Sequence, residues 1–169
     1  RGAVREALAA LETMRVIERR PNSGIYLRKI EESSIDALVL YAESGVPFEA
    51  KEIADVMEVR RMLEGQAVRL ACTRRTADNI REITAILEET NKRLSKKQSI
   101  EREDEAFHLA IFAATKNDIL LRMARSFYEL SRHRRKVYFA DQNRGRQSYE
   151  DHCTILEAIE ERRVGLAEQ

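Results

Sequence analysis

The chain has 169 residues and a formal net charge of +1, with 43% hydrophobic residues, 35% charged residues, six glycines and two prolines. This balance is rich in helix formers and poor in turn residues, so it predicts a mostly α fold and argues against an all-β one. No apolar run approaches the roughly 20 residues of a membrane span, and the two cysteines are isolated, which excludes a membrane protein and a disulfide framework and favours the reducing cytoplasm.

The N-terminal segment combines a helical pattern with a hairpin pattern. Apolar and small residues recur at helical spacing over residues 3–14, which predicts a helix packed against other elements. Residues 16–20 and 25–30 are rich in β-branched and aromatic side chains and flank the turn-forming segment 21–24. These two runs predict a β-hairpin.

Basic charge is concentrated in the same segment. Residues 1–30 carry seven Arg or Lys against three Glu, whereas the remainder carries 23 basic against 26 acidic residues. Arg1 and Arg5 lie about one turn apart on the predicted helix. A basic helix followed by a basic hairpin is what a winged helix presents to DNA, with the helix in the major groove. On spacing alone, a surface helix and hairpin with scattered arginines stays an alternative.

The segment resembles the second half of the winged helix-turn-helix of the GntR family of transcription regulators. That family has Ser-Arg-x-x-Val-Arg-x-Ala-Leu, then Leu, a Gly-rich wing tip and an apolar strand, and residues 1–27 resemble this pattern. The resemblance implies that Arg1 and Arg5 are the DNA-reading arginines of the recognition helix. It also implies that three residues form the wing tip, Asn22, Ser23 and Gly24.

Three positions depart from the family pattern. Gly2 and Ala3 stand where Thr and Pro are usual, and Arg15 stands where Gly is common. The first two helices of the winged module are absent from the sequence, so we expect the chain by itself to bind DNA weakly. With those helices restored, we expect Arg5→Ala to weaken operator binding by about 1–3 kcal/mol.

Capping residues and apolar periodicity predict helices over the rest of the chain. The predicted helices lie near residues 33–43, 50–73, 76–96, 99–115, 118–140 and 146–162, and another begins at about residue 164. Thr76 and Asn117 are placed to cap two of them, and Gly145 is expected just before the sixth. The expected fold is a partial winged helix-turn-helix, made of the recognition helix and its wing, followed by an antiparallel bundle of six to seven helices.

Asp104 and His108 are candidate metal ligands. They are four residues apart, so on a helix their side chains share one face, and the neighbouring Phe107 and Ile111 turn this face towards the core. His152 lies beside apolar residues of a second predicted helix and could close on the pair. One Asp and two His suit Zn, Ni, Mn or Fe, with a water or ligand oxygen completing the shell. A buried Asp–His hydrogen bond beside an unrelated His is the alternative.

Arg60 interrupts the apolar stripe of the predicted helix 50–73. A guanidinium that faces a core is unfavourable unless it is paired. An ion pair with Glu64, four residues further on, would satisfy it. Alternatively, Arg60 points into a cavity and binds the carboxylate of an effector through two hydrogen bonds.

Two further residues are not expected to be ligands. His133 lies in the strongly basic run S-R-H-R-R-K and is interpreted as part of a solvated helix face. Cys153 follows His152 directly, so on a helix it points about 100° away from that histidine.

The same part of the chain resembles the FadR-type C-terminal domain, called FCD, of GntR regulators. Its three landmarks appear in order as E-V-R-R-M-L-E-G-Q-A-V-R-L-A, D-E-A-F-H-L-A-I-F-A-A-T-K-N and D-H-C-T-I-L-E-A-I. The resemblance implies a metal ion held by one Asp and three His, of which Asp104, His108 and His152 match three. The fourth ligand would lie beyond Gln169.

The resemblance also implies that Arg60 binds the effector, and Asn117 is a further candidate for the same pocket. Residues 1–30 are therefore interpreted as the C-terminal half of a winged helix-turn-helix domain, and residues 31–169 as an all-helical effector-binding and dimerisation domain that is truncated at its C-terminus. The predicted function is a DNA-binding transcriptional regulator, a repressor by the commoner family behaviour, controlled by a small carboxylate at a divalent metal ion, Zn before Ni, Mn or Fe. Its predicted partners are a double-stranded DNA operator and a second copy of the chain, and no enzyme activity is expected.

Two other classes of function are compatible with the same residues. A metal-dependent hydrolase or other metalloenzyme on a helical bundle could use the open metal position to activate water, and metal-dependent turnover of small esters or acids would reveal it. A structural helical partner would bind neither metal nor a specific ligand.

Overall fold

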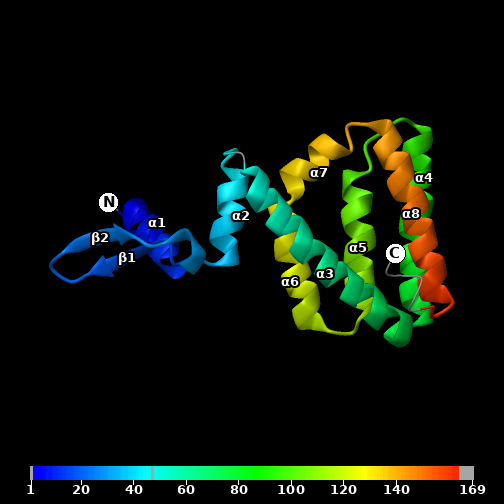
Figure 1. The fold of residues 1–169 in the computed structure, drawn as a ribbon, viewed down its shortest axis with the longest axis horizontal. Coiled ribbons are helices and arrows are strands. Elements are labelled where there is room, and N and C mark those ends of the chain that lie inside the picture. Colours follow the sequence, from blue (N-terminus) through cyan, green and yellow to red (C-terminus); the bar gives the residue numbers. More distant parts are fainter. Residues whose placement is uncertain (1, 47, 164–169) are drawn as a thin grey trace. The chain divides into compact units, whose positions relative to one another are not determined.

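The computed structural model describes residues 2–46 and 48–163. It divides into two compact units, Arg1–Phe48 and Glu49–Gln169 (Figure 1). The chain is mostly helical, with a helix and a hairpin followed by a helical bundle, so the predicted fold class is confirmed. No helix in the described part of the chain is long and apolar enough to cross a membrane. The helix predicted to begin near residue 164 lies outside the described residues.

The N-terminal unit contains the predicted helix and hairpin. Its elements are α1 (Gly2–Thr13), β1 (Ile17–Arg20), β2 (Gly24–Leu27), the 3-10 turn η1 (Ile30–Glu32) and α2 (Ile35–Glu43). The two strands are antiparallel, with Ile17 opposite Leu27 and Arg20 opposite Gly24. Ser34 caps α2, because its side chain accepts a hydrogen bond from the backbone N–H of Ala37.

Left-handed backbone occurs at both ends of this hairpin region. Arg15, between α1 and β1, has a φ of 58°, a conformation that glycine adopts without strain. This explains why Gly is common at the position in the family pattern. At the hairpin tip, Asn22 has a φ of 55° and Gly24 a φ of 135°. Asn and Gly tolerate such angles better than other residues, so the sequence of the tip matches its turn.

The helical unit is built around one central helix. Its described elements are α3 (Ala50–Arg74), α4 (Ala77–Ser95), α5 (Glu101–Ala114), α6 (Asp118–Leu130), α7 (Arg132–Tyr138) and α8 (Gln142–Glu160). In Figure 1, α5 lies between α6 and the pair α4 and α8, while α3 crosses it diagonally, and α5 packs against α3, α4 and α6. Phe107 and Phe112 of α5 are almost fully buried, as are Ile83 of α4 and Ile159 of α8. Asp104 and His108, also on α5, are buried with them.

Side-chain caps explain where two of these helices begin. Thr76 and Asn79 form a reciprocal capping box at the start of α4, with Asn in the place that Glu or Gln often takes. Asn117 caps α6, because its side chain accepts a hydrogen bond from the N–H of Leu120 at 3.1 Å. Both capping roles were predicted.

The helix predicted over residues 118–140 is instead two helices, α6 and α7, which meet at Ser131. The backbone carbonyl of Tyr128 accepts hydrogen bonds there from the Ser131 hydroxyl and from the Arg135 guanidinium. These side chains satisfy a carbonyl at a helix end, so the chain can leave the helix without an unpaired buried acceptor. The prediction of one continuous helix is therefore wrong.

Gly145 lies inside α8 and not before it, because α8 begins at Gln142, where the side chain of Asp141 provides the cap. The glycine is buried, and a Cβ atom at this position would lie 3.2 Å from the Leu94 side chain and 3.6 Å from that of Ile100. Gly145 therefore allows the first turn of α8 to pack closely against the end of α4 and the segment that follows it.

Candidate metal and effector site

The three predicted metal ligands come together in the core of the helical unit. Asp104 and His108 project from α5 and His152 from α8, all three are buried, and one potential ligand atom from each lies within 4.8 Å of the others. The Nε2 atoms of His108 and His152 lie 3.8 Å and 3.6 Å from the Asp104 Oδ1 atom. Helix spacing thus supplies two members of the group and tertiary packing supplies the third.

The contacts of Asp104 indicate that this group is incomplete without a ligand. Distances of 3.6 and 3.8 Å are too long for hydrogen bonds, and the nearest donor, the Ser148 hydroxyl, lies 3.4 Å from Oδ1. The other oxygen, Oδ2, is buried and has no hydrogen-bond partner in the described part of the chain. A buried carboxylate oxygen without a partner is unfavourable. One carboxylate and two imidazoles around a shared space could bind a divalent transition metal, so the residues fit a metal ion.

Packing fixes the orientation of both histidine rings. The His152 ring stacks on Phe107, with centroids 3.9 Å apart and planes 10° apart. The His108 Nδ1 atom lies 3.3 Å from a Glu64 carboxylate oxygen, while its Nε2 atom lies 3.3 Å from the Arg60 guanidinium. This arrangement favours the tautomer in which Nδ1–H donates to Glu64 and Nε2 keeps its lone pair. In this structure that lone pair accepts from the Arg60 guanidinium, and Nε2 also lies 3.8 Å from the Asp104 Oδ1 atom.

At neutral pH the buried histidines and Asp104 are all in the protonation state that metal binding requires. Burial is the main cause that lowers the pKa of His108 well below its usual value, and Arg60 and Arg135 lower it further. Burial also lowers the pKa of His152. Both imidazoles are therefore neutral and can donate lone pairs. Burial raises the pKa of Asp104 to about 6, which leaves the carboxylate ionised at pH 7.

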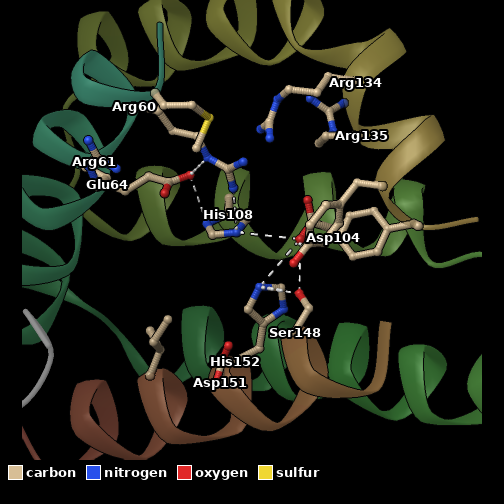
Figure 2. Close-up of a pocket in the computed structure, with 14 residues that line it drawn as sticks. Arg60, Arg61, Glu64, Asp104, His108, Arg134, Arg135, Ser148, Asp151 and His152 are labelled. Atoms are coloured by element: carbon tan, nitrogen blue, oxygen red, sulfur yellow. Dashed lines mark hydrogen bonds and ion pairs between the residues drawn. The ribbon is translucent and has the colours of Figure 1, made fainter. Parts of the chain in front are cut away.

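A cavity of about 340 Å³ opens beside the three residues (Figure 2). Arg60 lines this cavity, as does its partner Glu64, and the Nε atom of Arg60 lies 2.7 Å from a Glu64 oxygen. The hydroxyl of Tyr128 also donates a hydrogen bond to Glu64. The predicted ion pair with Glu64 is thus present, and because Arg60 also lines the cavity, its binding to an effector stays a prediction.

Asn117 does not belong to this cavity. Its side chain is committed to capping α6, and the residue is exposed. The sequence prediction that Asn117 binds the effector is thus not matched by its position.

Three residues that the sequence did not single out line the same cavity. Ser148 lies four residues before His152 on α8, so the spacing that paired Asp104 with His108 could have found it. Arg134 and Arg135 lie in the basic run interpreted as a solvated face, yet Arg135 is only 2% exposed. His133 is exposed as predicted, but the two residues that follow it, Arg134 and Arg135, line the cavity.

The predicted DNA-binding residues belong to the N-terminal unit. Arg5 is exposed on α1. The three residues of the hairpin tip are also exposed, Asn22, Ser23 and Gly24. Arg1 lies outside the described residues.

The helical unit matches a known family. Residues 55–169 match the family model of the FCD domain. The chain is 29% identical over 164 residues to the HTH-type transcriptional regulator LutR of Bacillus subtilis, which covers 94% of this chain and 74% of that protein. It is 26% identical to the Uxu operon regulator of Haemophilus influenzae, over 99% of this chain and 62% of that protein. It is 22% identical to the galactonate operon transcriptional repressor of Escherichia coli, over 100% of this chain and 75% of that protein.

Solved structures show the same fold. E. coli McbR/YncC superposes with a TM-score of 0.67 at 18% identity, over 97% of this chain and 75% of that chain. Streptococcus agalactiae GntR superposes with a TM-score of 0.62 at 20% identity, over 99% of this chain and 75% of that chain. The chain spans only part of the length of each protein, and the sequence relatives are transcriptional regulators, not enzymes.

Proposed function

Since the chain belongs to the FCD-domain, FadR-like subfamily of GntR transcriptional regulators, we propose that it controls transcription in response to a small carboxylate bound at a metal ion in its helical unit. The observation that carries this proposal is the buried group of Asp104, His108 and His152 at the edge of a cavity that also contains the Arg60 guanidinium. A metal ion in this group would supply a Lewis-acid centre for an oxygen of the effector.

The residues of the cavity favour a carboxylate as effector. Arg60 presents a planar, permanently charged guanidinium, which matches the two oxygens of a carboxylate. Its Nη2 atom lies 3.3 Å from the His108 Nε2 atom, so Arg60 and the metal ligands can contact the same acidic group. One relative is named as a repressor of a galactonate operon, and galactonate is itself a carboxylate.

The N-terminal unit supplies the proposed DNA-binding surface. Exposed Arg5 on α1 and the hairpin tip at Asn22, Ser23 and Gly24 would contact the major groove and the adjacent backbone, and Arg1 is proposed to act with Arg5. We propose residues 1–30 as part of the winged domain and residues 31–169 as the effector-binding and dimerisation domain. A homodimer on a nearly palindromic operator would place two such modules on successive major grooves.

Effector control follows from a difference in affinity between two states of the dimer. A carboxylate that binds more tightly to one arrangement of the helices shifts the dimer towards that arrangement, and only by that difference. We propose that the favoured arrangement spaces the two winged modules wrongly for the operator, so that the effector relieves repression. Zinc is the proposed metal because a site of one carboxylate and two imidazoles with an open position is common for it.

Operator binding measured by fluorescence anisotropy with the full-length regulator would test this function. Small carboxylates should release the wild-type protein from its operator. Arg60→Gln should bind DNA as tightly as the wild type but lose at least about tenfold in sensitivity to the carboxylate. Arg122→Gln, an exposed arginine of α6, should behave as the wild type. A response that is unchanged in Arg60→Gln would contradict the proposed role of this cavity.

A further inference from the structure

The cavity contains arginine side chains whose hydrogen-bonding capacity is not used. The Nε atoms of Arg134 and Arg135 are buried and have no hydrogen-bond partner among the residues that the structure describes. Arg135 is only 2% exposed, and its terminal nitrogens bond to the Tyr128 carbonyl, the Ser131 hydroxyl and Glu105. A buried N–H group without an acceptor is unfavourable, and on a charged guanidinium the penalty is larger. These two atoms therefore mark a place where an acceptor is missing.

The charges around the cavity point to an anion as that acceptor. Four arginines line it against three carboxylates, and a fourth carboxylate, that of Glu105, pairs with Arg135, so a bound metal ion would bring positive charge into excess. Arg60 is paired with Glu64, and Arg135 with Glu105. Arg134 has no ion pair within the described ranges of the chain. Burial lowers the pKa of Arg134, and the like charges of Arg60 and Arg135 lower it further, as expected for a cation without a counter-ion.

Arg134 and Arg135 lie across the cavity from His152. Figure 2 shows Arg134 and Arg135 together on one side, with the Arg134 guanidinium directed inward, and His152 with Ser148 on the other, with His108 and Asp104 between them. The two sides come from different elements, since α7 carries the two arginines and α8 carries His152. One acidic group at the metal ligands would leave the nitrogens of Arg134 and Arg135 unsatisfied.

We infer that the effector carries two acidic groups, one bound at the Asp104, His108 and His152 group beside Arg60 and the other bound by Arg134 with the free Nε of Arg135. The ligand class is a small dicarboxylate, or an acid that carries a phosphate or phosphonate in place of the second carboxylate, because a guanidinium binds both groups in the same way. A cavity of about 340 Å³ has room for a short molecule of this kind. The inference rests on the proposed function, since it places the first acidic group at the proposed metal site.

Matched pairs of ligands test the inference by isothermal titration calorimetry on the full-length, zinc-loaded protein. Malonate, succinate and glutarate are compared with propionate, butyrate and valerate, in which a methyl group replaces the second carboxylate. Phosphonopropionate shows whether a phosphonate replaces the carboxylate. We expect at least one diacid to bind about tenfold or more tightly than its matched monoacid, because only the diacid pairs with Arg134.

Three variants separate this inference from the proposed function. Arg134→Gln should reduce the affinity for the diacid to that for the monoacid, and the affinity for the monoacid should stay unchanged. His108→Ala should abolish the binding of both ligands. Arg132→Gln, an exposed arginine on the same helix, should change neither. Thermal melting of each variant checks that it is folded, and Arg134→Lys should recover part of the diacid preference because it keeps the charge without the guanidinium geometry.

The outcomes distinguish the proposed function from the inference of a second acidic group. If monoacids and diacids bind the wild type equally and His108→Ala removes both, the proposed site stands and the second acidic group is refuted. If Arg134→Gln weakens diacid and monoacid by the same factor, the second subsite is also refuted. If neither ligand class binds the wild type, both the proposed function and the inference fail.

Discussion

The charged residues that are proposed to bind ligands lie in opposite environments in the two units of the chain. In the N-terminal unit the side chain proposed to read DNA, that of Arg5, is exposed, and Ile17 is the one hydrophobic residue that is buried among the described residues of the unit. In the helical unit Asp104 is 3% exposed and Arg135 2% exposed, inside a core that also buries Ile83 completely.

This difference decides what kind of evidence each unit offers about function. An exposed arginine is stable whatever its role, so only the sequence pattern connects Arg5 with DNA. A buried carboxylate or guanidinium is unfavourable unless something compensates for it. The unpaired atoms of Asp104 and Arg134 are therefore physical evidence for a ligand, independent of any resemblance.

The largest expected effect concerns the core of the helical unit. Ile83→Ala removes a fully buried side chain and should lower the free energy of unfolding by about 2–5 kcal/mol. Val4→Ala removes a side chain of α1 that is 64% exposed. This variant should change the free energy of unfolding by less than about 0.5 kcal/mol. Urea denaturation followed by circular dichroism measures both. Equal effects would show that the two units do not differ in packing as described.

The pH dependence of stability tests whether Asp104 is buried in the helical unit. Burial raises the pKa of Asp104 from 3.8 to about 6, so the folded protein holds this proton more tightly than the unfolded chain does. The resulting stabilisation is complete below the unfolded value and is lost as the pH rises through the folded value. In the metal-free protein, the stability of the wild type relative to Asp104→Asn should therefore fall by about 2 kcal/mol between about pH 4 and pH 7.

The histidines act in the opposite direction but cancel in this difference. Burial lowers the pKa values of His108 and His152, so their contribution is lost as the pH falls below the unfolded value of 6.5, in the wild type and the variant alike. Urea midpoints across this pH range give the two profiles. Parallel profiles would mean that Asp104 is not buried as a carboxylate in the metal-free protein.

Arg5→Ala tests the exposed unit. In the full-length regulator it should weaken operator binding by about 1–3 kcal/mol, because an arginine in the major groove makes base or phosphate hydrogen bonds. Metal content and thermal stability should not change, since Arg5 is exposed in a unit separate from the cavity. Arg102→Ala, an exposed arginine of α5, is the matched control and should leave DNA binding unaltered. A gel-shift titration in which both variants bind like the wild type would remove α1 from the proposed DNA-binding surface.

The smallest expected effect lies at the junction of α1 and β1. Arg15 has a φ of 58°, so Arg15→Gly should relieve backbone strain and stabilise the N-terminal unit by about 0.5–1 kcal/mol. Glu6→Gly, within the same helix, should instead destabilise it by about 1 kcal/mol. Amide hydrogen exchange of α1 in the full-length protein would report both changes. Destabilisation by both glycines would mean that the Arg15 side chain contributes more than its backbone strain costs.

Sequence patterns predicted those features of the fold that local chemistry controls. The cap at Thr76 and the hairpin turn at Gly24 lie where they were expected, because each depends on residues a few positions apart. The interruption at Ser131 was missed, because it depends on the buried Arg135 side chain reaching the Tyr128 carbonyl. The position of Gly145 inside α8 was missed for a similar reason, since its close neighbour Leu94 comes from another helix.

The residues of the site also divide into those that local sequence spacing predicts and those that depend on tertiary packing. Asp104 and His108 could be paired from helix spacing alone, whereas the apolar neighbours of His152 indicated only that it could close on the pair, and the family resemblance added it to the ligand set. Arg134 and Arg135 could not be predicted as cavity residues, because a run of basic residues has the same composition whether it faces water or a cavity. Only the turn between α6 and α7 distinguishes buried Arg135 from exposed His133.

The metal content of the full-length protein, purified without added metal or an affinity tag, tests the central claim most directly. Elemental analysis should find about one equivalent of a transition metal, zinc foremost, in the wild type and in His133→Ala, which changes an exposed histidine of α7. His108→Ala should lose this metal, because the remaining Asp104 and His152 supply too few ligands. A wild type without metal, or a His108→Ala variant that keeps a full equivalent, would contradict the assignment of this site.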